Sequence, residues 1–207
     1  MPTGTYGVTL SVGGVSIQKS VTRTADGVIG VEAAVAAGKT GTLTTRTDDN
    51  TGIATMTTGH GLVSTDVCDI YWSGGMRYGM VATVSGDAVT LDGGSGTVLP
   101  STSTAVVVQK QIQVNVTVDG DALEILGVSL EYTDPSSTAV GHVDFQDTDD
   151  DSIEAVDLVA NVPQVWDIEG GASNVFTGDV ITKALVTNGS SSAAAVIKIV
   201  GLQDVTP

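Results

Sequence analysis

The residue in this chain that most invites a chemical role is His60, which lies between Gly59 and Gly61 in the stretch GIATMTTGHGL. A catalytic triad would have to bring a nucleophile and a carboxylate to this imidazole. The second histidine, His142, lies far along the chain, and the carboxylates near His60 in sequence are Asp66 and Asp69. A metal site would need several such ligands to converge. The pattern therefore favours a turn or core histidine.

The densest run of charge is DFQDTDDDS, residues 144–152. Asp147, Asp149 and Asp151 give the D-x-D-x-D opening of a calcium loop. The glycine expected at the sixth position is Ser152, however, and the acid expected at the twelfth is Leu158, so the run is not an EF-hand. Two interpretations stay open: a calcium site on these three aspartates, or a solvated hairpin tip. The second is favoured because charge runs are usually solvated.

Signatures of enzymes are otherwise missing from the sequence. There is no G-x-S-x-G elbow, and DGGSGTV at 92–98 lacks the lysine of a phosphate loop. With 24 acids, no pair of carboxylates stands out for glycoside hydrolysis. Aromatic residues make up only 4%, which argues against a sugar-stacking site. Trp166 is expected in a core, and Trp72, beside Ser73–Gly75, is the better candidate for a contact surface. We expect a protein that is not an enzyme.

Charge excludes several partners. The chain contains 8 Lys and Arg residues and 24 Asp and Glu residues, which gives a net charge of −16. It is therefore expected to repel nucleic acid and anionic lipid surfaces. Residues 1–110 hold 8 acids and 6 bases, whereas 111–207 hold 16 acids and 2 bases. The single cysteine, Cys68, allows no intrachain disulfide. No stretch has the length of an apolar membrane span or the pattern of a signal peptide, so the protein is expected to be made soluble in the cytoplasm, or to leave it by a route other than the usual signal peptide.

The elements that position these residues are predicted to be strands. Val, Thr, Ser and Gly dominate the composition, which is typical of sheets and turns. Two alternating runs around Gly13–Gly14 predict a hairpin, and 111–134 predicts a second one that the first would join. Residues 31–37 could form one helical turn. Short strands every 8 to 12 residues from 39 to 109 predict a small barrel. The expected fold is all-β: a β-sandwich of 1–38 plus 110–207, with 39–109 inserted as a β-barrel-like module.

Residues 52–94 resemble a small β module of bacteriophage virion and tail-associated proteins. The shared pattern is a Thr/Val strand, a His-Gly-Leu turn, a Tyr-Gly strand, and Val-Ser-Gly before a hydrophobic-Thr-hydrophobic strand. The chain departs from it at Ser64–Asp66, where Gly-Asp is usual, and in the extra Trp72–Gly75. The resemblance implies a virion protein made in the host cytoplasm, with a structural role for His60. It also implies a homo-oligomer, for which a trimer is the expected arrangement.

These observations together predict a structural capsid decoration or surface-accessory protein that contacts other virion proteins, the major capsid protein first among them. Docking is assigned to the less charged part of the chain, through the residues Lys19, Arg23, Lys39, Arg46, Trp72 and Arg77. The alternatives are a phage tail component, a bacterial cell-surface adhesion module and, third, a polysaccharide-degrading enzyme.

Overall fold

The computed structural model describes residues 4–12, 15–23, 26–94, 96–115, 123–162, 164–165 and 183–204, and side chains within 32–94, 96–114, 127–162 and 183–199. Over these ranges the chain forms strands and no helix, which confirms the all-β prediction. It divides into two compact units. The sandwich unit comprises residues 1–35, 113–186 and 194–207, and the barrel unit comprises 36–112 and 187–193.

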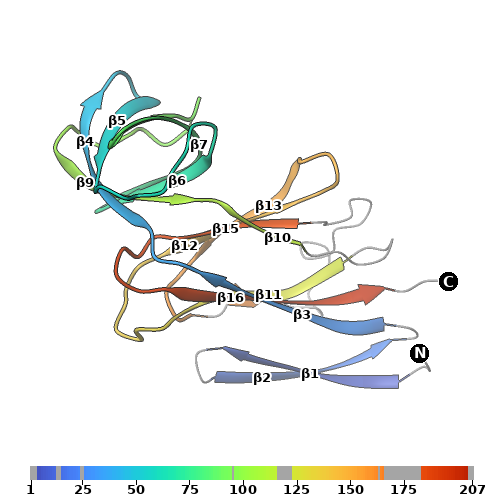
Figure 1. The fold of residues 1–207 in the computed structure, drawn as a ribbon. Coiled ribbons are helices and arrows are strands. Elements are labelled where there is room, and N and C mark those ends of the chain that lie inside the picture. Colours follow the sequence, from blue (N-terminus) through green and yellow to red (C-terminus); the bar gives the residue numbers. More distant parts are fainter. Residues whose placement is uncertain are drawn as a thin grey trace. The chain divides into compact units, whose positions relative to one another are not determined.

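The barrel unit is a closed six-stranded sheet (Figure 1). Its strands are β4 (Lys39–Arg46), β5 (Thr51–Met56), β6 (Val67–Trp72), β7 (Gly75–Ser85), β8 (Ala88–Asp92) and β9 (Thr104–Lys110). The order around the barrel is β4-β5-β8-β7-β6-β9, every pair is antiparallel, and β9 closes the ring on β4 from Lys39↔Val108 to Leu43↔Thr104. Closure leaves no free sheet edge in this unit.

Alternation of apolar residues along these strands builds the barrel core. In β5 the buried positions are Gly52, Ala54 and Met56, with more exposed residues between them, as the two-residue period of a strand requires. The other strands also contribute side chains to the core, so that the enclosed residues come from all six, although in β6 four successive residues are buried. The core consists of Leu43, Ala54, Met56, Leu62, Cys68, Ile70, Met80, Ala82, Val89, Leu91, Leu99, Val106 and Val108.

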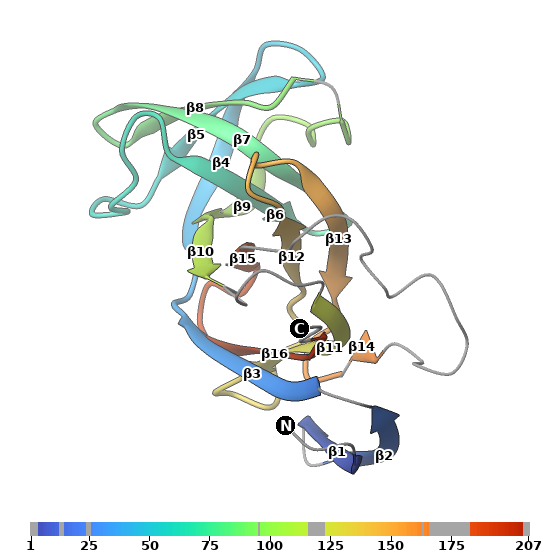
Figure 2. The same ribbon diagram turned by 90° about the vertical axis from the view of Figure 1, so that its right-hand side faces the viewer.

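The sandwich unit contains two four-stranded sheets, which Figure 2 shows from a second side. One has the order β14-β11-β16-β3, made of β14 (Gln164–Val165), β11 (Leu123–Tyr132), β16 (Ala195–Asp204) and β3 (Asp26–Val35). The other has the order β10-β15-β12-β13, made of β10 (Ile112–Asn115), β15 (Lys183–Asn188), β12 (Gly141–Gln146) and β13 (Ser152–Leu158). A separate two-stranded sheet pairs β1 (Gly4–Val12) with β2 (Val15–Arg23).

Apolar side chains from both four-stranded sheets fill the sandwich core. Ile197 and Ile199 of β16 alternate with polar or half-buried neighbours, and Val143 and Phe145 do the same on β12. Strand β16, which comes from the apolar run AAAVIKIVGL, lies between β11 and β3 inside its sheet. The buried set in the described part of this unit also includes Val35, Val114, Val128, Leu130, Tyr132, Leu158, Ala184, Val186 and Ala195.

Three details of the sequence prediction are corrected. The helical turn suggested for 31–37 is wrong up to Val35, because β3 continues to that residue and pairs with β16 from Ala195↔Val35 onward. The hairpin expected within 111–134 is also wrong, because β10 and β11 belong to different sheets. Finally, residues 187–193 belong to the barrel unit and not to the sandwich. The first hairpin is confirmed in its strands, which pair from Gly4↔Arg23 to Val12↔Val15.

Candidate functional site

His60 is a buried turn residue, which confirms the interpretation of its sequence setting. Gly59 and Gly61 on either side of it have positive φ angles of 81° and 75°. The ring Nδ1 accepts a hydrogen bond from the Leu62 N–H at 3.0 Å, so Nε2 carries the hydrogen and donates to the Gly86 carbonyl at 3.2 Å. Both ring nitrogens are therefore used to join two turns of the barrel. Neither is directed at a nucleophile.

A shallow groove of about 250 Å³ lies beside His60 in the barrel unit. Hydroxyl groups dominate it, and they bond to one another or to the barrel: Thr40 Oγ1 lies 2.8 Å from Thr57 Oγ1, and Thr58 donates to the Asp87 carboxylate at 2.7 Å. Its lining residues are Ala37, Gly38, Lys39, Thr40, Thr57, Thr58, Gly59, His60 and Ser191. Because His60 bonds only backbone groups and not Thr58, the groove contains no nucleophile–base pair.

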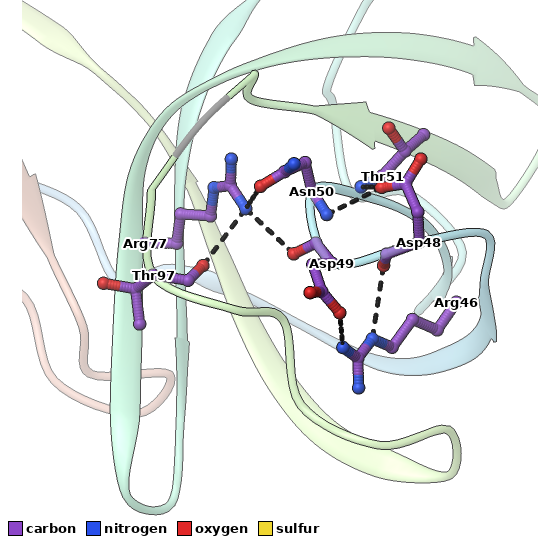
Figure 3. A network of polar contacts seen from close by, with 7 residues as sticks. All are labelled: Arg46, Asp48, Asp49, Asn50, Thr51, Arg77 and Thr97. Atoms are coloured by element: carbon purple, nitrogen blue, oxygen red, sulfur yellow. Dashed lines mark hydrogen bonds and ion pairs between the residues drawn. The ribbon is translucent and has the colours of Figure 1, made fainter.

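Arg77 holds together the loops at one end of the barrel (Figure 3). Its side chain is only 3% exposed. Nη1 donates to the carbonyls of Asp49 and Thr97 at 3.0 and 3.1 Å and to Asn50 Oδ1 at 3.0 Å, and Nη2 donates to the Gly94 carbonyl. The guanidinium has several donors in a fixed fork, which suits it to satisfying many buried carbonyls at once. The prediction of Arg77 as a docking cation is therefore corrected: its buried guanidinium bonds to loops of the barrel itself and is not exposed to a partner.

The loop between β4 and β5 is ordered by its own aspartates. Asp48 Oδ1 accepts the N–H groups of Asn50 and Thr51, both at 2.7 Å, and these bonds hold the pKa of Asp48 below its usual value. Arg46, another predicted docking residue, forms an ion pair with Asp49 and donates through Nε to the Asp48 carbonyl at 3.2 Å (Figure 3). This hairpin loop is thus held by short-range polar contacts together with Arg77.

A second polar network is buried on the outward side of β6. Asp69 Oδ1 accepts the Gly79 N–H at 3.0 Å and Gln111 Nε2 at 2.8 Å, and Oδ2 accepts the Thr187 hydroxyl at 2.6 Å. Since Thr187 gives its hydrogen to Asp69, Tyr71 is the donor in the 2.6 Å contact between the two hydroxyls. These donors satisfy the buried Asp69 carboxylate. The network anchors residues 187–193 to the barrel and presents nothing to a substrate.

Cys68 and Asp66 are close to this network in sequence: Cys68 belongs to the barrel core, and Asp66 is a buried carboxylate paired with Lys110. Burial raises the pKa of the Cys68 thiol to about 12, and the charges of Asp66 and Asp69 add to the effect. Burial also opposes ionisation of Asp66, but the ion pair with Lys110 and the Val63 N–H outweigh it, so the pKa of Asp66 lies below its usual value. A thiol with a raised pKa is a poor nucleophile, so Cys68 serves as a core residue.

The acidic loop does not arrange its carboxylates around a common point. Asp147 Oδ1 accepts the N–H groups of Asp149 and Asp151 at 2.8 and 3.0 Å, and Asp150, with a positive φ of 70°, pairs with Lys183. Within the ranges that the structure describes, no three His, Cys, Asp or Glu side chains are grouped so that they could hold a metal ion. The calcium interpretation of Asp147, Asp149 and Asp151 receives no geometric support.

Trp72 is only partly available as a contact residue. It packs against the barrel core, and its ring lies over Gly75, where an added Cβ would come within 2.6 Å of the indole. Lys19 and Arg23 lie on β2, and their side chains fall outside the described set, as does Trp166. Lys39 is exposed at the start of β4.

Sequence reasoning missed the exposed valines of the barrel. Val67 of β6 and Val81 of β7 lie opposite each other in the pairing of the two strands, and they are 40% and 47% exposed. Val63, which is 58% exposed, lies in the loop before β6. The Asp66 N–H bonds the Val63 carbonyl at 3.2 Å, which ties this loop to the start of β6. Alternation alone could have placed Val67 and Val81 outside, because Cys68, Met80 and Ala82 point into the core. We call these three residues the valine patch.

Comparisons with known proteins give no assignment: no family model, no curated protein and no solved structure matches the chain. In the described residues there is also no helix long and apolar enough to cross a membrane.

Proposed function

We propose that the chain is a non-enzymatic structural component of a phage-like virion, a capsid decoration or surface-accessory protein that docks through its barrel unit. The resemblance of residues 52–94 to a virion β module is the starting point. The geometry supports a structural role because the side chains capable of chemistry in the barrel are engaged with its own backbone and side chains. His60, Cys68 and Asp69 all stabilise turns or the interior.

The observation that carries the proposal is the division of charge between the two units. The barrel unit holds four bases and six acids, a net charge of −2, whereas the sandwich unit holds four bases and eighteen acids, a net charge of −14. Proteins that carry large charges of the same sign repel one another. A nearly neutral unit is repelled little by a negatively charged protein surface, while a strongly acidic unit favours contact with solvent. The barrel therefore docks and the sandwich faces outward.

Within the barrel we assign docking to the valine patch rather than to Trp72 and Arg77. Val63, Val67 and Val81 are the exposed apolar side chains of one loop and two adjacent strands. Protein contacts gain most of their affinity from a desolvated apolar centre with a polar rim. Lys110, paired with Asp66, and Ser64, bonded to the Val84 N–H at 2.9 Å, supply polar groups beside the patch. The partner that we propose for this surface is the major capsid protein.

Particles produced from the genome that encodes the chain provide the test. Density-gradient purification followed by quantitative mass spectrometry should find the chain in filled heads, in a fixed ratio to the major capsid protein. Recovery in tail fractions alone would identify a tail component, and absence from all particles would overturn the proposal. Screens against polysaccharides and esters should show no turnover; activity abolished by replacing a single Asp or Glu would instead support an enzyme.

A further inference from the structure

The N-terminal hairpin forms a sheet of its own. β1 and β2 pair over nine positions, from Gly4↔Arg23 to Val12↔Val15, and among the described residues no third strand bonds to either of them (Figure 1). A two-stranded sheet is at best marginally stable in water, because it buries little surface and leaves both edges unpaired. The hairpin therefore gains stability wherever it can add to another sheet.

The same unit offers a sheet edge of matching length. β3 is the last strand of the order β14-β11-β16-β3 and pairs with β16 over ten positions, from Ala195↔Val35 to Asp204↔Asp26. In the part of the chain that the structure describes, its other edge has no partner (Figure 2). Such an edge presents a row of unpaired N–H and C=O groups and is a template for strand addition. The nine-residue strands of the hairpin therefore fit along the ten residues of the β3 edge.

Charge favours this combination. Residues 1–25 contain Lys19 and Arg23 and no acid, a net charge of +2, whereas residues 26–207 contain 6 bases and 24 acids, a net charge of −18. β3 itself contains Asp26 and Glu32 and no base. The hairpin is thus the basic segment of an otherwise acidic chain, and the edge that it would meet is acidic. Such complementarity speeds association and selects the partner.

We propose that the hairpin of one copy adds to the free edge of β3 in a second copy, so that the chain assembles through an intermolecular sheet. This inference rests on the proposed function, because it describes how copies of a structural protein would contact one another. Each copy both donates a hairpin and accepts one, so a closed assembly covers the free edge of every β3 and pairs one edge of every hairpin. Main-chain hydrogen bonds supply the affinity, and Lys19 and Arg23 supply the preference for an acidic edge.

The test uses the purified full chain without virions, so that its result is independent of the particle analysis above. Sedimentation velocity over a range of concentrations is combined with hydrogen exchange read by mass spectrometry. We expect an oligomer that dissociates on dilution, with amide protection lost in 4–23 and 26–35 while β4–β9 stay protected. A monomer at every concentration, or an oligomer in which protection in 4–35 does not depend on concentration, would overturn the proposal.

Charge reversal supplies an independent arm. Lys19→Glu with Arg23→Glu should weaken association at least about tenfold at low ionic strength, and less in high salt. The control is Lys39→Glu with Arg46→Glu, which changes the net charge equally but lies in the barrel; it should leave association within about twofold, since general repulsion is screened. Equal weakening by both double variants would contradict the assignment of the hairpin.

Discussion

The hydroxyl of Thr187 lies 2.6 Å from Oδ2 of Asp69, although 118 positions separate the two residues. This bond, with the 2.6 Å contact between Thr187 and Tyr71, explains why residues 187–193 belong to the barrel unit. Asn188 strengthens the same attachment by donating to the Ala36 carbonyl at 3.3 Å, and it also donates to the Ala193 carbonyl within the segment at 2.9 Å. The barrel is thus completed by a segment that follows most of the sandwich in sequence.

Replacing Thr187 by Val should lower the free energy of unfolding by about 1–3 kcal/mol, because the buried Asp69 carboxylate and the Tyr71 hydroxyl each lose a partner. Thr187→Ser keeps the hydroxyl and should recover most of this loss. Urea denaturation of the three proteins measures the difference. If Thr187→Ser is destabilised and Thr187→Val is not, packing of the methyl group and not the hydrogen bond is responsible.

Replacing Arg77 by Met should cost about 2–4 kcal/mol, since the carbonyls of Asp49, Gly94 and Thr97 would lose their buried donor. Arg46→Met is the matched control, because it removes only a more exposed ion pair and one backbone contact, worth about 0–1 kcal/mol. Chemical denaturation monitored by the tryptophans provides the measurement. Similar losses in the two variants would refute the central role of Arg77.

Cys68 should resist thiol reagents in the folded protein at pH 8, because it is buried and its pKa is raised to about 12. Reaction with a chromogenic disulfide reagent should be slow in buffer and rapid in denaturant, where the thiol regains an ordinary pKa near 8.5. Thr187→Val should increase the rate if the attachment of 187–193 limits opening of this part of the barrel. Rapid labelling of the native wild-type chain would contradict the described burial.

Calcium should not stabilise the protein specifically. The Asp147 carboxylate already accepts the loop N–H groups and Asp150 pairs with Lys183, so the carboxylates do not form a preorganised ligand set. The thermal unfolding midpoint of the wild-type chain should be the same in millimolar calcium and in sodium of equal ionic strength. The same agreement is expected for the variants Asp149→Ala and Asp151→Ala. A calcium-specific increase that both substitutions abolish would restore the metal site; a full site at a hundredfold excess over Kd would add about 2.7 kcal/mol.

Docking through the barrel predicts that Val67→Asp with Val81→Asp abolishes binding to capsids purified without the chain. A charge at an apolar contact must be desolvated without a partner, so a loss of at least about 100-fold in affinity is expected. Val98→Asp is the control, because Val98 is 49% exposed in a different loop of the barrel. Co-sedimentation with capsids measures binding. Equal binding by all three proteins would place the docking surface elsewhere.

Local pattern was enough to identify much of this architecture. Alternation of residue types predicted strands, glycine turns separated them, and the short spacing between 39 and 109 indicated a barrel module. These features depend on residues near one another, because the period of a strand and the φ angles of a turn are set within a few positions. The turn role of His60 could be inferred for the same reason, because two glycines flank it and Leu62, which donates to its ring, is two residues away; its second partner, Gly86, is 26 positions away and was not predictable.

Tertiary structure alone decided which strands pair and which polar groups meet. Nothing in residues 111–134 shows that β10 and β11 belong to different sheets, because either could satisfy its backbone with any strand of suitable pattern. Likewise, no local signal turns Arg77 inward or brings Thr187 to Asp69, since each depends on carbonyls or carboxylates supplied by distant loops. The sequence by itself determined the strands, the turns and the uneven charge, whereas long-range closure determined which side chains are buried and which remain for partners.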